Sequence, residues 1–375
     1  MLSNNTSAMY NHTNEAETHA FQEQLVLADK IIILFFAIFT ILGNTLVLVA
    51  TWRERSLHQP NKYFIACLAV ADLLVGTILE PLMVYQLSLD VELKQTMPIH
   101  LCRFMVWIDT FTLAASIYSL TFISFDRYFK ISRPLQYRSR MTTSKSLKII
   151  FTIWLISTAF ATYAATPHSG SWGILQTSSN FCPIDGTKEK GFYTFLAVSA
   201  FFLPTALILV MYALIFVVVH KREKMLRNGK LGQTCNDRKQ RSAFLQDLRN
   251  IRILLVVVGV FVLCWGPYII YILLWHYNPN LIDRDRRSSS YIRRILIADF
   301  VIARLPYLNS LCNPIIYACL DQTYREALQH LFQQMMCRPT SRRRPPTNGI
   351  RQVTTTENKT KQYLITESRY SENVV

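Results

Sequence analysis

Long apolar runs alternate with polar segments along most of the chain. Four runs contain no charged residue, and each is near or above the roughly 18 to 20 residues that an α-helix needs to cross a bilayer. They cover residues 31–50, 149–166, 191–219 and 253–275. Three further runs, which carry a few charges, cover residues 61–86, 99–133 and 294–320. Because helices satisfy their own backbone hydrogen bonds in lipid, the pattern predicts seven membrane-spanning helices.

The segments outside these runs divide the chain into four parts. Residues 1–26 are polar and are expected to form an extracellular tail, and residues 27–320 to form an all-α bundle of seven transmembrane helices. Residues 321–337 have apolar side chains at helical spacing but are too short and polar to span, which predicts an amphipathic helix on the membrane surface. Residues 338–375 are basic and then rich in Thr and Ser, a composition typical of a disordered cytoplasmic tail.

The net charge of +16 is explained by where the basic residues lie. Residues 129–148 contain six Lys or Arg and no acid, and residues 220–250 contain nine against three acids. Cytoplasmic loops carry such an excess, so these alternate loops place the N-terminus outside the cell and the C-terminus in the cytoplasm. The charge therefore indicates a multi-pass plasma-membrane protein that contacts anionic lipid headgroups, and not a nucleic-acid-binding protein.

The cysteines do not form a disulfide framework. Of the eight, four lie inside the predicted spans and two on the cytoplasmic side, where thiols stay reduced. Cys102 and Cys182 remain on the outer side, which predicts one disulfide between the third span and the loop after the fourth. Cys337, beyond the amphipathic segment, is a candidate for palmitoylation. Glycosylation sequons on the outer side begin at Asn4, Asn5 and Asn11.

The third run carries charges in ordered positions. Asp109 interrupts its outer half, and Asp126 and Arg127 close its inner end. An unpaired charge deep in hydrocarbon costs about 3 kcal/mol, so Asp109 faces the protein interior or a water-filled cavity. It is either a salt-bridge partner or an anionic anchor for a cationic ligand. We favour the anchor, because the other charges inside the seven runs are few and lie mostly near their ends.

A second acid, Asp72, falls near the middle of the second run. A buried acid needs partners, and the candidates are Ser116 in the third run with Asn309, Ser310 and Asn313 in the seventh. Oxygen-rich ligands of this kind suit a hard cation or a proton.

Three motifs occur in order on the third, sixth and seventh runs. They are Asp-Arg-Tyr at 126–128, Cys-Trp-x-Pro at 264–267 and Asn-Pro-x-x-Tyr at 313–317. Each is common alone, but together and in this order they are highly specific. Over about residues 27–337 the chain resembles the rhodopsin-like (class A) G-protein-coupled receptors, and Asp109 stands where biogenic-amine receptors place the carboxylate that pairs with a protonated ligand.

The resemblance implies a ligand site for a small amine. Tyr307 matches a tyrosine that hydrogen-bonds the receptor carboxylate at the position of Asp109, and Trp265 and Tyr268 would form an aromatic wall suited to cation-π contact. The implied ligand-binding residues are Asp109, Thr110, Leu113, Leu196, Ala200, Trp265, Tyr268, Ile269 and Tyr307.

The resemblance also implies a switch that admits a heterotrimeric G protein. Arg127 would be held by Asp126 and Asp247 in the inactive state and released when the sixth span swings outward. The implied activation residues are Asp126, Arg127, Tyr128, Tyr212, Asp247, Phe261, Asn313, Pro314 and Tyr317. A sodium ion favouring the inactive state would be held by Asp72, Ser116, Asn309 and Asn313; no other cofactor is expected. Phosphorylation of the tail by a receptor kinase would create a docking site for arrestin.

Departures from the amine-receptor pattern narrow the ligand class. Where receptors for catecholamines and serotonin carry serines or threonines in the fifth run, this chain has Leu196, Ala197 and Ala200. A non-catechol amine is therefore expected. The alternative within the same fold is a receptor for a nonamine ligand or a constitutively active receptor.

Two extra acids, Glu80 and Asp299, lie near the predicted outer mouth. One possibility is that they form a second contact for a cationic ligand. The other is that they form ion pairs with Arg304 and with Arg293 or Arg294. We expect the ion pairs, since acids in membranes usually find a partner.

Two other functional classes receive little support. An ion-coupled transporter is disfavoured because internal repeats and paired broken helices are absent from the sequence pattern. An enzyme is not expected, because the histidines fall in or beside loops and span ends without the spacing of a metal or nucleophile site.

Overall fold

The computed structural model describes residues 2–89, 98–171, 173, 185–227, 235–278 and 289–335. The chain divides into two compact units, Met1–Leu331 and Phe332–Val375. The second unit is described only over residues 332–335, so the predicted tail at 338–375 lies outside the described residues. The spans all belong to the first unit.

Seven helical stretches are long and apolar enough to cross a membrane, judged by length and composition. They are Glu17–Arg53, Lys62–Ser88, Ile99–Ser132, Thr143–Ala164, Glu189–Lys221, Ile251–Tyr277 and Ser290–Leu320. Each predicted run corresponds to one stretch, although the ends differ by several residues. The prediction of an all-α, seven-helix fold is confirmed.

Several helices extend beyond the apolar runs, and two spans are irregular. The first and third spans are α1 (Leu2–Arg53) and α5 (Ile99–Ser132), the fourth is α7 (Thr143–Ala164), and the sixth and seventh are α10 (Cys235–Tyr277) and α11 (Ser289–Leu320). The second comprises α2 (Pro60–Leu74), a π-helical turn (Val75–Leu79) and α3 (Glu80–Ser88). The fifth comprises α8 (Glu189–Ala197), a π-helical turn (Val198–Phe202) and α9 (Leu203–Arg227).

In the part of the chain that the structure describes, four shorter helices connect or follow the spans. They are Arg55–Leu57, α6 (Pro134–Arg140), Pro167–Ser169 and α12 (Gln322–Met335). The last corresponds to the amphipathic helix predicted at residues 321–337. The expected outer tail, residues 1–26, is helical from Leu2 and continuous with the first span.

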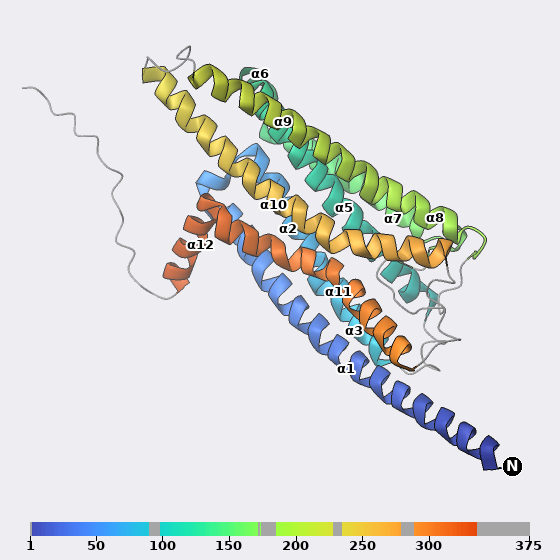
Figure 1. Ribbon diagram of the computed structural model, residues 1–375. Coiled ribbons are helices and arrows are strands. Elements are labelled where there is room, and N and C mark those ends of the chain that lie inside the picture. Colours follow the sequence, from blue (N-terminus) through green and yellow to red (C-terminus); the bar gives the residue numbers. More distant parts are fainter. Residues whose placement is uncertain are drawn as a thin grey trace, which may run out of the picture. The chain divides into compact units, whose positions relative to one another are not determined.

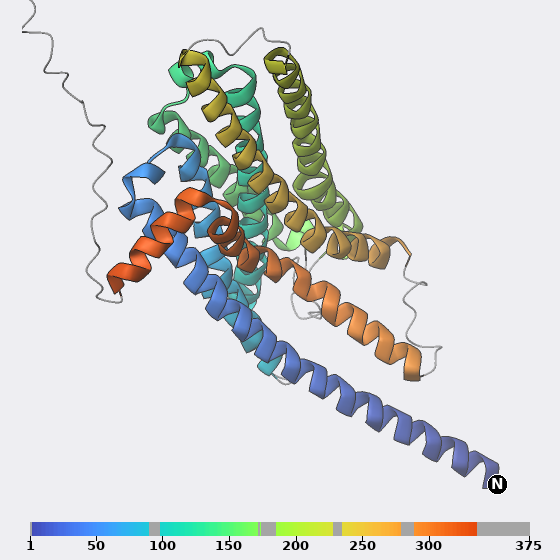
Figure 2. The same ribbon diagram turned by 60° about the vertical axis from the view of Figure 1, so that its left-hand side comes forward.

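The third span, α5, is the central helix of the bundle. It contacts α2, α7, α9 and α10, and 78% of its most apolar window is buried, more than in any other span. Figures 1 and 2 show α1 and α11 side by side, as their contacts require. Asp109, Asp126 and Arg127 of α5 are accordingly buried in protein.

One small residue permits the close approach of α1 and α11. A Cβ atom on Gly43 would lie 2.9 Å from both Cβ and Cγ of Pro314. The next residue, Asn44, is buried, and its Nδ2 donates to the carbonyl oxygens of Thr40 (3.0 Å) and Ser310 (3.2 Å). Helix association in lipid relies on such close packing and interhelical hydrogen bonds. The Gly-Asn pair thus holds α1 against the Asn-Pro motif of α11.

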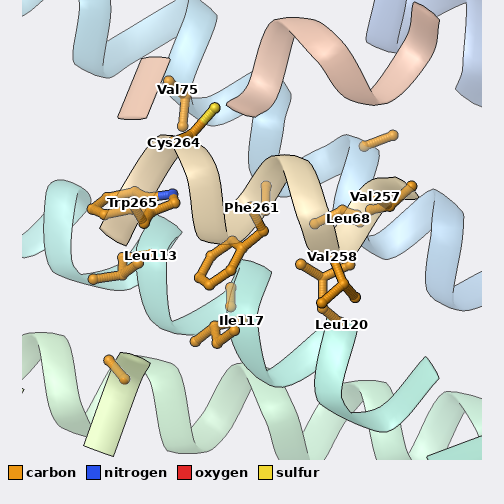
Figure 3. Packing of buried hydrophobic residues seen from close by; sticks show 14 of the residues in the cluster. Leu68, Val75, Leu113, Ile117, Leu120, Val257, Val258, Phe261, Cys264 and Trp265 are labelled. Carbon is orange, nitrogen blue, oxygen red and sulfur yellow. The ribbon is translucent and has the colours of Figure 1, made fainter. Parts of the chain in front are cut away.

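The apolar core joins α5 to α10. Figure 3 shows Leu113, Ile117 and Leu120 of α5 beside Phe261 and Trp265 of α10. All five side chains are buried members of one cluster. Since lipid tails are as apolar as these side chains, the contact is stabilised mainly by close van der Waals packing.

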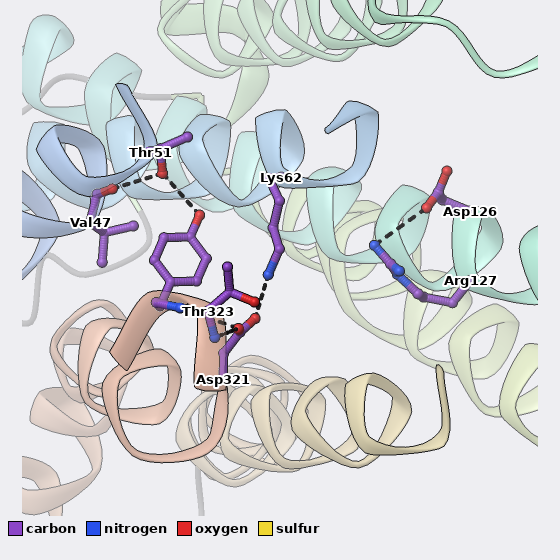
Figure 4. Close-up of polar contacts among 8 residues, drawn as sticks. Val47, Thr51, Lys62, Asp126, Arg127, Asp321 and Thr323 are labelled. Atoms are coloured by element: carbon purple, nitrogen blue, oxygen red, sulfur yellow. Dashed lines mark hydrogen bonds and ion pairs between the residues drawn. The ribbon is translucent and has the colours of Figure 1, made fainter. Parts of the chain in front are cut away.

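An ion pair at the inner end of the bundle joins α2 to the start of α12 (Figure 4). Lys62 pairs with Oδ2 of Asp321, and both side chains are buried. Oδ1 of Asp321 accepts hydrogen bonds from the backbone N–H groups of Thr323 (3.0 Å) and Tyr324 (3.3 Å), so it also caps α12. The Tyr324 ring lies 4.7 Å from the Lys62 ammonium, and its hydroxyl is 2.9 Å from that of Thr51. One carboxylate therefore both neutralises a buried cation and orients α12.

We predict that Asp321→Ala lowers the melting temperature of the detergent-solubilised protein. The substitution leaves Lys62 as an uncompensated buried charge, which lowers the free energy of unfolding by about 3 to 5 kcal/mol. The double variant Lys62→Met, Asp321→Leu should recover most of this loss, because an apolar pair replaces the ion pair. Glu326→Ala, on the exposed face of the same helix, is the control. Equal melting temperatures for Asp321→Ala and Glu326→Ala would contradict the role of the pair.

Candidate functional site

The predicted ligand-binding residues are all buried and come from the third, fifth, sixth and seventh spans. The seven apolar or aromatic ones belong to the single buried core cluster: Leu113, Leu196, Ala200, Trp265, Tyr268, Ile269 and Tyr307. Asp109 and Thr110 are the buried polar members, both on α5. Residues far apart in the sequence therefore meet inside the bundle.

Asp109 is the acid of this site. It is 1% exposed, and its charge acts on the hydroxyls of Tyr268 and Tyr307. Tyr307 is itself 1% exposed, and its hydroxyl has no hydrogen-bond partner among the described residues. A carboxylate, an aromatic face and a phenol hydroxyl are thus gathered in one buried region, a combination suited to an organic cation.

An aromatic series leads from this region into α10. The Trp265 and Tyr268 rings meet edge to face with centroids 6.4 Å apart, and Phe261 lies 6.3 Å from Trp265. Phe201 of the fifth span lies 6.0 Å from Phe261. Pro267, inside α10, removes a backbone hydrogen bond at the same level. The Trp265 ring therefore lies two residues from the point where α10 lacks a backbone hydrogen bond.

The expected ion pair between Glu80 and Arg304 is wrong. Arg304 contacts the carboxylate of Asp29 on α1 through Nε and Nη2, and both side chains are buried. The reason is that α1 extends further outward than the apolar run and brings its own acid. Arg293 pairs with Glu17, at 3.0 Å.

Glu80 is the unexpected feature of this region. It follows the π-helical turn of the second span and is 0% exposed. Neither of its carboxylate oxygens has a hydrogen-bond partner within the part of the chain that the structure describes. Its charge acts on Tyr307, as that of Asp109 does.

Two of the four predicted cation ligands are in contact deeper in the bundle. Oδ2 of Asp72 accepts from Nδ2 of Asn313 at 2.8 Å. Three buried oxygens have no hydrogen-bond partner among the described residues: Oδ1 of Asp72, Oδ1 of Asn309 and Oδ1 of Asn313. Ser116 is also buried. One carboxylate with several neutral oxygens fits a hard monovalent cation such as sodium.

The Asp-Arg-Tyr motif forms a buried charge pair at the inner end of α5 (Figure 4). Nη2 of Arg127 lies 3.6 Å from Oδ2 of Asp126. The hydroxyl of Tyr137, on α6, donates to Oδ1 of the same aspartate at 3.0 Å. Tyr128 is half-buried. Arg127 and Tyr137 therefore both contact the carboxylate of Asp126. The sequence did not indicate the contact with Tyr137.

The remaining activation residues with described side chains are also buried. They are Tyr212, Phe261, Asn313, Pro314 and Tyr317. The hydroxyls of Tyr212 and Tyr317 have no hydrogen-bond partner among the described residues. The Tyr317 ring stacks on that of Tyr324, with centroids 5.7 Å apart.

Several predicted residues lie outside the described part. Cys102 is disulfide-bonded, but Cys182, its predicted partner, is not described. The side chain of Asp247 is likewise not described, although its backbone belongs to α10. The remaining undescribed side chains are Asn4, Asn5, Asn11 and Cys337.

Sequence reasoning missed four contributors to these sites: Asp29, Lys62, Tyr137 and Asp321. A signal existed for the two acids, because Arg304 and Lys62 are cations in buried helices and each requires an acidic partner. The partners are distant in sequence, and only the packing of helices identifies them.

Comparison with known proteins agrees with this architecture. The sequence model described as "7 transmembrane receptor (rhodopsin family)" matches residues 43–317. The chain is 29% identical to the human alpha-1A adrenergic receptor, over 81% of this chain and 67% of that receptor. The alpha-1A adrenergic receptor of Oryzias latipes is 31% identical, over 82% and 67%. The human alpha-1D adrenergic receptor is 29% identical, over 83% and 57%.

The match covers more than half of the chain, and it includes the spans that carry all three motifs. The seven apolar helices agree with it. The chain therefore belongs to the rhodopsin family of seven-transmembrane receptors, which are membrane receptors and not enzymes.

Proposed function

We propose that this protein is a plasma-membrane receptor for a small, protonated, non-catechol amine and that it activates a heterotrimeric G protein. The observation that carries the proposal is the burial of Asp109 beside Tyr268 and Tyr307. Relatives named as adrenergic receptors support an amine ligand. Arg304, a buried cation of the same region, contacts Asp29 instead, which favours the anchor role of Asp109 over a salt bridge to this arginine.

The lining of the fifth span supports a non-catechol ligand. Leu196 and Ala200 are buried and offer no hydrogen-bonding side chain. Ser199, the nearest hydroxyl in sequence, donates to the carbonyl oxygen of Phe195 in its own helix at 2.7 Å. Two catechol hydroxyls placed against this wall would lose their hydrogen bonds to water without replacement, which is costly.

Activation is a population shift between a restrained and an open state. Asp126 and Tyr137 hold the motif at the inner end of α5 in the restrained state. A ligand that contacts Trp265 favours the open state only if it binds that state more tightly. Outward movement of α10 at Pro267 then frees Arg127 for the G protein, and the hydroxyls of Tyr212 and Tyr317 gain partners.

The inner cation site biases the same equilibrium. Asp72, Ser116, Asn309 and Asn313 would hold a sodium ion that favours the restrained state. Their unsatisfied buried oxygens support this proposal. A bound cation would supply positive charge to a carboxylate that otherwise lies uncompensated in the membrane interior.

The tails complete the proposal. The N-terminus is extracellular and glycosylated at Asn4, Asn5 and Asn11, and Cys102 and Cys182 form the outer disulfide. The C-terminus is cytoplasmic, where Cys337 is acylated, α12 contacts lipid, and Ser and Thr residues serve a receptor kinase and arrestin. The observation that Cys102 is disulfide-bonded supports the assignment of the outer disulfide.

We predict that Asp109→Asn raises the half-maximal concentration of amine agonists by about thirtyfold or more, the low end of the cost of truncating a buried charge pair. A second-messenger assay in transfected cells with a panel of amines measures this. In the same panel, phenethylamine should act at lower concentration than its catechol counterpart dopamine.

The control for this substitution is Asp185→Asn on the outer loop. The Thr187 hydroxyl, 2.5 Å away, lowers the pKa of Asp185, so this variant also removes a real negative charge at neutral pH. It should leave the response unchanged. An unaltered response in Asp109→Asn at normal surface expression would refute the anchor role and favour a nonamine ligand. Greater potency of dopamine would refute the non-catechol assignment.

We predict that Asp126→Asn raises basal signalling, because it weakens the restraint on Arg127. A loss of about 1.4 kcal/mol would change the ratio of the two states about tenfold. Tyr137→Phe should act in the same direction but less, and Asp247→Ala tests the second expected restraint. Agonist-independent second-messenger levels, normalised to surface receptor number, give the readout. Basal levels equal to wild type in all three variants would show that no such restraint operates.

We predict that agonist affinity falls when sodium replaces a bulky organic cation in the buffer and that Asp72→Asn abolishes this dependence. Linkage requires a cation that favours the restrained state to weaken agonist binding. Competition binding on membranes measures the effect, with potassium as the control ion. Equal sodium sensitivity in wild type and Asp72→Asn would exclude this site.

A further inference from the structure

The outer ends of the fifth and sixth spans are joined by a histidine–carboxylate pair that the mechanism above does not use. α8 packs against α10 (Figure 1). Nε2 of His276, near the end of α10, lies 2.8 Å from Oε1 of Glu189, the first residue of α8. One residue further along α10, the hydroxyl of Tyr277 is 2.7 Å from that of Thr194 on α8. We call His276 and Glu189 the outer latch.

Both ring nitrogens of His276 face hydrogen-bond acceptors. Nδ1 lies 2.7 Å from the carbonyl oxygen of Ile272, and Nε2 faces the Glu189 carboxylate. A carbonyl and a carboxylate only accept hydrogen bonds, and a neutral imidazole has a single N–H to donate. The two contacts are satisfied together only when the imidazole carries its second proton. The geometry of the outer latch therefore selects the protonated form of the pair.

The surroundings supply few other charges to the outer latch. Among the described residues, Glu189 is the charged group in contact with the imidazole. Lys188 pairs with Asp185 at 3.5 Å, and Arg293 of α11 pairs with an acid of α1. The titratable or charged groups of the surrounding elements are Lys188, Lys190 and Tyr193 beside Glu189, Tyr271 and Tyr277 on α10, and Tyr291, Arg293 and Arg294 at the outer end of α11.

Tyr193 connects the outer latch to the ligand site. Its ring lies against that of His276, with centroids 4.6 Å apart, and it is buried. The Tyr193 hydroxyl donates to the carbonyl oxygen of Gly173 at 2.9 Å. Tyr193 and Asp109 both act electrostatically on the hydroxyl of Tyr268. A ring contact followed by two electrostatic interactions thus leads from His276 to the proposed amine anchor.

The outer latch also bears on the movement of α10. His276 lies nine residues outward of Pro267, a rise of about 14 Å along the helix. A pivot at Pro267 that carries the inner end of α10 outward also displaces its outer end, and a link to α8 opposes that displacement. The latch is closed in a structure in which Arg127 is paired with Asp126. It therefore belongs to the restrained state.

We propose that His276 is a positioning residue of the ligand site and that its protonation from the outer side stabilises the restrained state and reduces the response to amines. This inference rests on the proposed amine-receptor function and adds its regulation by extracellular pH. Histidine side chains ordinarily change charge between about pH 5 and 8. The protonated contact favours the restrained state, so its effect is present at acidic pH and is lost as the pH rises. By linkage, agonists bind more weakly at acidic pH.

Two measurements at an extracellular pH of about 6 and about 8 test the inference. The first is the melting temperature of the purified receptor without ligand, and the second is the half-maximal concentration of phenethylamine in cells. The wild type should need about tenfold more phenethylamine at the acidic pH, the value of one hydrogen bond to a charged group. Alkylamines, like lysine, stay protonated over this range, so the ligand itself does not cause the shift.

Four substitutions assign the pH dependence to a residue. His276→Gln should need the same phenethylamine concentration at both pH values. His276→Lys keeps a positive charge and should behave at both pH values as the wild type does at the acidic one, which a purely structural role does not produce. Glu189→Gln places an amide that donates to the neutral imidazole, so the pH dependence should be lost. His168→Gln, an exposed histidine of the outer loop, is the matched control and should keep the wild-type profile.

The melting temperature gives an independent comparison. The wild type should exceed His276→Gln by more at about pH 6 than at about pH 8, because only the protonated pair joins α8 to α10. Parallel pH profiles of the wild type, His276→Gln and Glu189→Gln would overturn the inference. Greater potency of phenethylamine on the wild type at acidic pH would overturn it as well, because the latch would then favour the open state.

Failure of the proposed function has a different signature. Loss of the pH profile in His168→Gln alone would assign the proton to the outer loop and overturn the role of His276. A melting temperature that follows the latch variants as expected, without a response to phenethylamine or any other amine of the panel, would retain the outer latch and overturn the amine-receptor function.

Discussion

The structure depends on one constraint, which is that a charge in the interior of a membrane protein requires a neutralising partner. The chain meets it in three places with its own residues. Lys62 is paired with Asp321 at the inner end, and Arg304 with Asp29 in the outer half. The Asp126 and Arg127 side chains, adjacent on α5, neutralise one another. The first two pairs join different helices, so each also restricts how those helices can move.

Three other buried acids mark the functional regions. Asp72 lies among neutral oxygens, whereas Glu80 and Asp109 lie near a tyrosine and aromatic rings. The first environment suits a small hard ion, and the second suits an organic ammonium. A difference in neighbours thus distinguishes the two proposed cation sites.

Irregular helix geometry brings these groups to the interior. π-helical turns occur beside Glu80 in the second span and beside Ala200 in the fifth. Prolines interrupt α10 at Pro267 and α11 at Pro306 and Pro314. Such features are retained in membrane helices where neighbouring groups satisfy the freed backbone. They give the bundle both the side-chain orientation of its sites and the points at which it bends.

The sequence by itself determined the number of spans and the positions of the main motifs. Length and apolarity predict a transmembrane helix directly, because each span satisfies its own backbone in lipid. The sequence also identified Asp109, Arg127 and Asp72 as candidate functional residues, because a charge inside an apolar run is costly wherever that run lies.

Only the tertiary structure decided which charges meet. Glu80 was the expected partner of Arg304, yet Asp29, 275 residues away, makes the contact. Tyr137 and Asp321 became visible only through their contacts with Asp126 and Lys62. The physical reason is that a helix specifies the direction of its side chains relative to its own axis, whereas the rotation and depth of each helix follow from packing against all the others. A π-helical turn changes that direction without a clear sequence signal, and so the exceptional burial of Glu80 was a property of the fold alone.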